Sequence, residues 1–195
     1  MYTILHYIVN MGAYSLLGAA VCLLVRAGQH RKNGGAWEWR REALLLLFAA
    51  YCTGLASQTI LPRWSAGIDS GSGLPFLDIS LHNDLASVNL IPFRTILRQL
   101  RLLTHPSGDI RTFAVVNLAG NLLVFSPFGI LLPLLWPRFR RVGPLLLTGM
   151  LISAGIEGIQ LFVGRSTDVD DVIFNALGVL IGYGLYRLFA AAREK

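Results

Sequence analysis

The sequence predicts an all-α membrane protein, a polytopic helical bundle of about five transmembrane helices plus an amphipathic helix at the outer membrane surface. Hydrophobic residues make up 54% of the 195 residues and charged residues only 14%, and the mean hydropathy is +0.56. This composition is typical of polytopic membrane proteins rather than soluble domains. Five apolar runs have the roughly 20 residues needed to cross a hydrocarbon core: approximately residues 2–25, 43–61, 113–136, 144–163 and 172–192.

The distribution of basic residues predicts the orientation of these runs. Most of the 17 lysines and arginines follow the first, third and fifth runs, and the net charge is +6. Because cytoplasmic loops are enriched in lysine and arginine, we expect the N-terminus outside and the C-terminus in the cytoplasm. Topology thus accounts for the basicity, and we expect no nucleic-acid partner.

The first part of the chain, residues 1–50, is expected to hold the first helix and a cytoplasmic loop. Its apolar run has no basic leader, so we interpret it as a retained helix rather than a cleaved signal peptide. Cys22 and Cys52 both lie within apolar runs, which favours small buried thiols over a disulfide or a metal site.

Residues 62–111 form the predicted extracytoplasmic segment. Its turn-rich stretch 65–73 is not expected to support a helix or strand for long. Arg94, Arg98 and Arg101 then follow i, i+4, i+7 spacing, which predicts a helix in the outer headgroup layer with guanidinium groups available to lipid phosphates. The alternative is a surface anchor with solvated charges.

The third run carries Asn117 and Asn121 one turn apart and is then interrupted by Pro127. Proline removes a backbone donor, so a kink or break is expected, which either shapes a binding cavity or bends a structural helix. In the fifth run, Gly178 and Gly182 form a GxxxG pattern that permits close helix approach.

Polar side chains gather where the third, fourth and fifth runs reach the outer surface. Glu157 is the most unusual, because an unpaired carboxylate within an apolar run is costly. We expect one membrane-depth site from Asn89, Asn117, Asn121, Glu157, Gln160, Arg165, Asp168, Asp171 and Asn175. Helix capping by Asp168 and Asp171 is the simpler alternative for those two residues.

These motifs together resemble the VanZ-like membrane proteins, a family named after an accessory glycopeptide-resistance protein associated with teicoplanin resistance. The resemblance is strongest over residues 51–189 of a single domain, 1–195. It is carried by Asn89-Leu90-Ile91-Pro92-Phe93, by Asn117-x-x-Gly120-Asn121-x-x-x-Phe125-x-Pro127-Phe128-Gly129, by Ser153-x-x-x-Glu157-x-x-Gln160, and by Arg165-x-x-Asp168-x-x-Asp171-x-x-x-Asn175-x-x-Gly178. It implies a helical bundle in the bacterial plasma membrane and a link to glycopeptide susceptibility, without implying catalytic residues.

Three functions are compatible with this pattern. The first is a non-enzymatic binding protein for a membrane lipid, such as a lipid-linked cell-wall precursor, or for a glycopeptide. The second is an intramembrane enzyme using Glu157 with Asp168 or Asp171. The third is a small lipid transporter, for which a homo-oligomer would be needed. Because His6, His30, His82 and His105 form no ligand motif and no nucleophile motif occurs, the sequence favours binding, with no cofactor and no metal.

Overall fold

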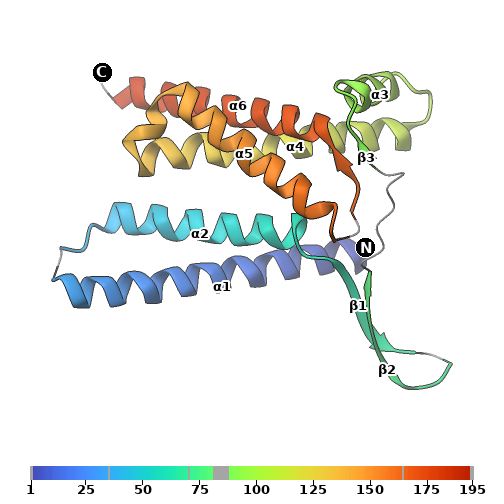
Figure 1. Ribbon diagram of the computed structural model, residues 1–195, viewed down its shortest axis with the longest axis horizontal. Helices are drawn as coiled ribbons and strands as arrows, with labels where there is room; N and C mark the ends of the chain where they lie inside the picture. Colours follow the sequence, from blue (N-terminus) through green and yellow to red (C-terminus); the bar gives the residue numbers. More distant parts are fainter. Residues whose placement is uncertain (1, 35, 70, 81–87, 164, 194–195) are drawn as a thin grey trace.

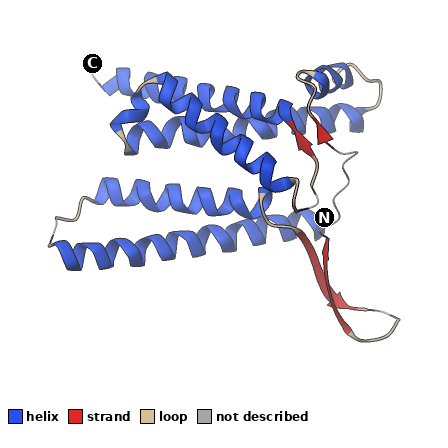
Figure 2. Cartoon of the chain, viewed as in Figure 1, coloured by secondary structure: helices blue, strands red, loops and turns tan. Residues whose placement is uncertain are grey.

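The computed structural model describes residues 2–34, 36–69, 71–80, 88–163 and 165–193. Residues 81–87 of the predicted outer segment, including His82, lie outside this part of the chain. The described residues form six α-helices, a short 3-10 helix and two small sheets of two strands each. The protein is therefore mostly helical, but the predicted all-α class is wrong in detail (Figure 2).

Two groups of helices make up the body of the protein (Figure 1). The first is an antiparallel hairpin of α1 (Tyr2–Asn33) and α2 (Trp39–Thr59). In the second group, α6 (Val169–Arg193) packs against both α4 (Gly108–Leu135) and α5 (Val142–Gln160). The two groups meet where α2 contacts α4.

Four of these helices, α1, α4, α5 and α6, are long and apolar enough to cross a membrane, so the chain is a multi-pass membrane protein. The predicted second run also forms a helix, α2, but α2 is not among the four. Its first turn contains Arg40, Arg41 and Glu42 and its last residues are Gln58 and Thr59. These polar ends lower its hydropathy.

The apolar core lies between α4, α5 and α6, around Phe125, Phe128, Leu145 and Val179. Close packing of α4 on α6 depends on glycine: a Cβ on Gly182 would overlap the carbonyl oxygen of Ser126. Gly178 approaches the backbone of α4 in the same way, at Leu122. The structure therefore confirms the predicted role of the GxxxG pattern in helix approach.

Helix α4 continues through Pro127, so the predicted alternative of a broken helix is wrong. Proline removes the amide that would bond to the carbonyl of Leu123. The hydroxyl of Ser126 donates to that carbonyl instead, at 2.9 Å. This side-chain hydrogen bond satisfies the freed acceptor within the helix.

The turn-rich stretch is not irregular, which corrects a second expectation. Strands β1 (Arg63–Ile68) and β2 (Pro75–Ser80) form an antiparallel hairpin that projects away from the helices (Figure 2). Gly71, Ser72 and Gly73 lie in its turn, where Gly73 has a φ of +69° and the Ser72 amide donates to Asp69 at 2.8 Å. Turn chemistry thus favours the hairpin rather than preventing strands.

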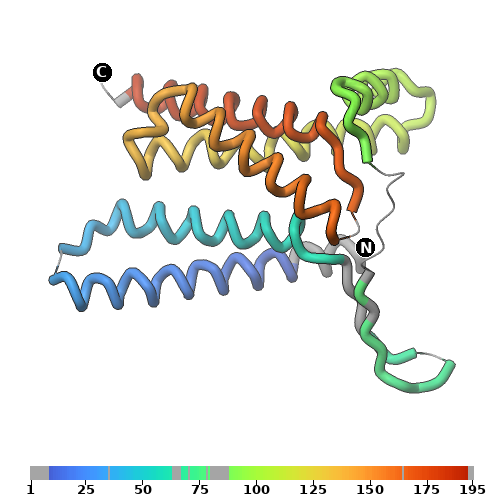
Figure 3. The backbone as a smooth tube through the Cα atoms, in the orientation of Figure 1, coloured from blue at the N-terminus to red at the C-terminus, as the bar shows by residue number. Residues whose placement is uncertain are grey.

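The remaining elements define the two ends of the molecule. At one end lie α3 (Arg94–Leu102) and a short parallel pair, β3 (Val88–Asn89) with β4 (Thr167–Asp168). At the opposite end lie the α1–α2 connection, the 3-10 helix η2 (Pro137–Arg140) and the C-terminal part of α6 (Figures 1 and 3). We call these the polar end and the basic end.

Candidate functional site

The β3–β4 pair brings two predicted site residues into direct contact. The side-chain amide of Asn89 donates to Asp168 Oδ1 at 2.9 Å and to Thr95 Oγ1 at 3.2 Å. The Thr95 hydroxyl in turn donates to Asp168 Oδ2. Both carboxylate oxygens of Asp168 are therefore engaged, and this network fixes the start of α6 against the start of α3.

Asp170 holds the N-terminus of α3. Its fully buried carboxylate accepts hydrogen bonds from the backbone amides of Phe93, Thr95 at 2.7 Å and Ile96 at 3.0 Å. Phe93 has a φ of +66°, a left-handed conformation that is costly for a bulky residue. The three amides are donors that a helix N-terminus leaves unsatisfied, so Asp170 both caps α3 and supports the turn that precedes it.

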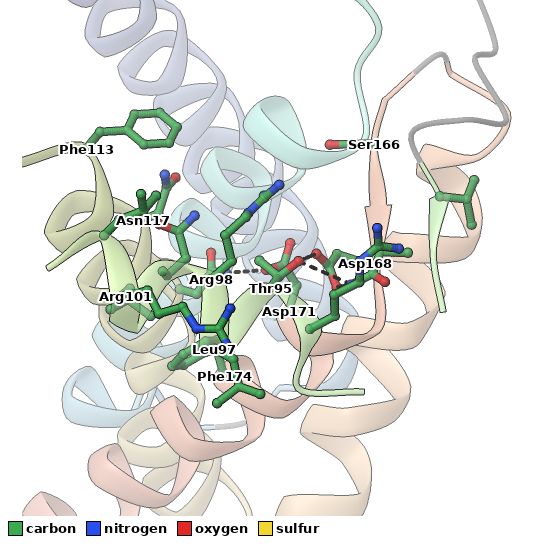
Figure 4. Close-up of a pocket in the computed structure, with 17 residues that line it drawn as sticks. Thr95, Leu97, Arg98, Arg101, Phe113, Asn117, Ser166, Asp168, Asp171 and Phe174 are labelled. Atoms are coloured by element: carbon green, nitrogen blue, oxygen red, sulfur yellow. Dashed lines mark hydrogen bonds between the residues drawn. The ribbon is translucent and has the colours of Figure 1, made fainter. Parts of the chain in front are cut away.

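A cavity of about 950 Å³ opens between α3, α4 and the start of α6. Three of its lining residues, Arg94, Arg98 and Arg101, are the arginines of α3, as Figure 4 shows for the last two. The predicted site residues that line the cavity are Asn89, Arg94, Arg98, Arg101, Asn117, Asn121, Asp168 and Asp171. The arginines of α3 and several residues of the predicted polar site thus line the same cavity.

The α4 wall of the cavity carries the two asparagines. The side-chain amide of Asn121 donates to Asp171 Oδ1 at 2.6 Å, and Asn117 lies one turn closer to the polar end. In Figure 4, Asn117, Arg98 and Arg101 lie on one side of the Thr95–Asp168 hydrogen bond. The cavity therefore presents amide and guanidinium donors with the Asp171 carboxylate among them.

The other predicted site residues do not line this cavity. Glu157 is buried behind β4, where its Oε2 accepts from the Asp168 amide at 2.9 Å. Gln160 donates to the Thr59 carbonyl at 3.1 Å, which ties α5 to α2, and Asn175 donates to Ser153 Oγ at 2.8 Å between α6 and α5. The backbone amide of Arg165 donates to the Gln160 carbonyl at 3.1 Å. The Gln160 and Asn175 contacts thus join helices, the Glu157 contact holds β4, and the Arg165 contact lies at the end of α5.

Sequence reasoning assigned no site role to Thr95, Gln99 or Asp170. Gln99 lines the cavity, has only 6% of its surface exposed, and its Oε1 makes no hydrogen bond among the described residues. A polar residue at the fourth position after Thr95 on the same helix could have indicated a shared face. For Asp170, the indication was the group of three acids at 168, 170 and 171, because capping α6 does not require three carboxylates.

The charges around the cavity favour an anionic ligand. Arg94, Arg98 and Arg101 line it together with Asp168 and Asp171, and Asp168 already accepts three hydrogen bonds within the chain. Guanidinium groups bind phosphate and carboxylate oxygens through two parallel hydrogen bonds. In the described part of the chain, no group of three or more His, Cys, Asp or Glu side chains could hold a metal ion.

Comparison with known proteins agrees with the sequence motifs. The VanZ/LLP1 family model matches residues 43–190. Protein VanZ of Enterococcus faecium is 31% identical over 105 residues, which cover 52% of this chain and 53% of that protein. The chain therefore spans about half the length of this relative. No solved structure matches. Because the family model covers most of the sequence, including every element that forms the cavity, the chain belongs to the VanZ/LLP1 family.

Proposed function

We propose that this protein binds the phosphate-bearing headgroup of a membrane lipid, such as a lipid-linked cell-wall precursor, or a glycopeptide docked at the membrane, in the cavity at the polar end. The observation that carries the proposal is the presence of Arg94, Arg98 and Arg101 along one side of a single cavity of about 950 Å³. Three guanidinium groups on adjacent turns can bind several phosphate oxygens at once.

Gln99 adds a second requirement for the ligand. Its buried Oε1 is an acceptor with no partner among the described residues, and an unsatisfied buried acceptor costs about 1–3 kcal/mol. A ligand with a hydroxyl or amide donor would satisfy it. A phosphate joined to a sugar or a peptide provides both the anion and such donors, which distinguishes this ligand class from a bare phosphate.

Apolar side chains at the cavity are suited to the hydrocarbon part of the same ligand. Leu97 and Phe113 line the cavity and are 52% and 61% exposed. Exposed apolar groups beside a charged cavity in a membrane protein can contact acyl or isoprenoid chains. The cavity thus combines a polar headgroup site with an apolar border.

The proposed location of the site is extracytoplasmic. By the positive-inside rule, the basic end would lie in the cytoplasm and the polar end outside, with α2 as a fifth span. Lipid-linked precursors and glycopeptides meet on the outer face of the bacterial plasma membrane. Binding either ligand there would reduce glycopeptide action, so we propose a contribution to teicoplanin resistance.

The test is direct binding to the purified full-length protein in lipid nanodiscs. One arm uses a fluorescent lipid-linked cell-wall precursor and the other uses fluorescent teicoplanin. Each arginine near a phosphate contributes about 1 kcal/mol, so the Arg98→Ala/Arg101→Ala variant should bind about 30-fold more weakly. The control is Arg111→Ala, because Arg111 is exposed on α4 and does not line the cavity. Since this control removes one charge, the single variants Arg98→Ala and Arg101→Ala are compared with it as well.

The outcomes separate the ligands as well as testing the site. Weaker binding of one probe in the double variant, with the control unchanged, supports the proposal and identifies the ligand. Unchanged binding of both probes, or equal losses in the double variant and in Arg111→Ala, refutes an anion site specific to this cavity.

The enzymatic alternative has less support from the geometry. Of its candidate residues, Glu157 does not line the cavity, and both carboxylate oxygens of Asp168 accept hydrogen bonds from the chain. Asp171 also lines the cavity, and among the described residues its side chain accepts one hydrogen bond, from Asn121. A general acid and base must both reach the reacting group, which this arrangement provides for one carboxylate at most.

A further inference from the structure

A second cavity lies at the basic end, at the opposite end of the helices from the site described above. It has a volume of about 650 Å³ and lies between the start of α2 and the junction of α4 with η2. Arg40 and Arg41 line it from α2 and Arg140 lines it from η2, with Glu38 as the acid among these lining residues. The excess of positive charge favours an anionic occupant.

The three arginines differ from Arg26, another arginine near the basic end. The guanidinium of Arg26 is held by two hydrogen bonds to the carboxylate of Glu42. By contrast, the guanidinium groups of Arg40, Arg41 and Arg140 are exposed and make no ion pair within the described chain. Their charge is therefore available to a ligand.

The walls of this cavity are held by two partly buried contacts. The hydroxyl of Tyr183 on α6 donates to the backbone carbonyl of Arg140 at 2.7 Å, which attaches η2 to the bundle. Trp136, another lining residue, packs edge-to-face on Phe48 of α2 with ring centroids 5.5 Å apart. The arginines are thus presented from two elements whose backbones are held in place relative to each other, as a preorganised site requires.

Apolar groups continue from the charged cavity along the helices. Trp39 lines its border and is 76% exposed, and Leu44 and Leu134 line the side toward the middle of α2 and α4. Exposed tryptophan is typical of the level where headgroups meet hydrocarbon. This order of groups suits a site whose charged part lies at headgroup depth and whose apolar part lies at acyl-chain depth.

We propose that this cavity binds the phosphate of an anionic phospholipid, with an acyl chain lying against Leu44 and Leu134. Basic pockets between helices at the cytoplasmic side recognise acidic lipid headgroups through the same combination of groups. This site is independent of the ligand proposed for the polar end. A lipid bound in this cavity would link the α1–α2 hairpin to the group of α4, α5 and α6, because Arg40 and Arg41 belong to α2 and Arg140 belongs to η2, which joins α4 to α5.

The test uses the full-length protein in phosphatidylcholine nanodiscs and a photoactivatable phosphatidylglycerol. Cross-links are mapped by mass spectrometry, and unlabelled competitors give the affinity. At about 1 kcal/mol for each arginine, Arg41→Ala/Arg140→Ala should weaken binding at this cavity about 30-fold. The control, Arg31→Ala/Arg138→Ala, removes the same charge at the basic end from exposed residues outside the cavity lining.

The proposal predicts cross-links at Leu44 or Leu134 that phosphatidylglycerol displaces and that phosphatidylethanolamine and inorganic phosphate do not. It also predicts that the control double variant weakens binding less than Arg41→Ala/Arg140→Ala does, since only the lining arginines can donate hydrogen bonds to the phosphate. Equal losses in both double variants would show a non-specific charge effect and refute the site. Displacement by inorganic phosphate alone would refute a lipid ligand. If the double variant does not fold, Arg140→Ala and Arg138→Ala are compared in the same way.

Discussion

The role of Asp170 as the anchor of α3 can be tested by replacing it with alanine. The carboxylate accepts hydrogen bonds from the amides of Phe93, Thr95 and Ile96. Asp170→Ala leaves these amides without acceptors. Each hydrogen bond to a charged group contributes about 1.5 kcal/mol at the low end of the measured range, so three give roughly 4.5 kcal/mol. Water reaching the amides will reduce this to about 3 kcal/mol or more.

The expected consequence is local opening of α3 rather than unfolding of the bundle. Helix α3 packs mainly on α4 and, to a smaller extent, on α6, and it also bonds to β3 and β4 through Thr95. The apolar core lies elsewhere. Because 1.4 kcal/mol corresponds to a factor of ten, amide hydrogen exchange at residues 93–97 should accelerate by about a hundredfold or more. The measurement is hydrogen exchange with mass spectrometry in detergent or nanodiscs.

The control for this experiment is Asp109→Ala, which removes an exposed carboxylate from the first turn of α4. Asp109→Ala should leave exchange at residues 93–97 unchanged. Asp170 does not anchor α3 if Asp170→Ala also leaves this exchange unchanged, or if exchange accelerates equally in the core of α4 and α6.

Two further predictions concern the packing of α4 on α6 and the Arg26–Glu42 ion pair between α1 and α2. Gly182→Ala places a Cβ against the Ser126 carbonyl and should lower the free energy of unfolding by about 1–3 kcal/mol, measured by thermal unfolding in detergent. At the other end, hydrogen bonds from the Arg26 guanidinium lower the pKa of Glu42 from 4.5 to about 2. Because a lowered pKa stabilises the folded state above the unfolded pKa, this stabilisation is lost as the pH falls from about 4.5 toward 2, and the Tm of the protein falls with it.

Each of these predictions has a matched control. Gly184→Ala introduces the same methyl group into open space, so a destabilisation equal to that of Gly182→Ala would contradict the packing argument. Glu42→Gln has no charge to lose, so its Tm should change less with acid than that of the native protein. If the Tm values of the two proteins fall in parallel as the pH is lowered, the Arg26–Glu42 pair does not contribute to the stability of the folded state.

Much of the helical structure could be predicted because it depends on local patterns. The spacing of Arg94, Arg98 and Arg101 predicts α3, and Gly178 and Gly182 predict the close approach of α4 and α6. Helices are determined largely by periodicity and length within one segment, which a single sequence contains. The convergence of Asn121 and Asp171 also followed from the alternation of helix direction.

The features that were not predicted depend on contacts between distant segments. Pairing of β1 with β2 requires a register between two strands, and the β3–β4 pair joins residues that are far apart in the chain. The carboxylate of Asp170 bonds to amides near Phe93, so its role is visible only once α3 is placed. Burial of Glu157 behind β4, rather than in the cavity, has the same origin.

The central claim, a headgroup site lined by the α3 arginines, is tested most directly by the lipids that co-purify with the protein. Lipids are extracted from the native protein, from Arg98→Ala/Arg101→Ala and from Arg111→Ala, and are identified by mass spectrometry. We predict that one phosphate-bearing lipid is retained by the native protein and by Arg111→Ala but depleted in the double variant. An identical lipid complement in all three proteins would contradict the claim.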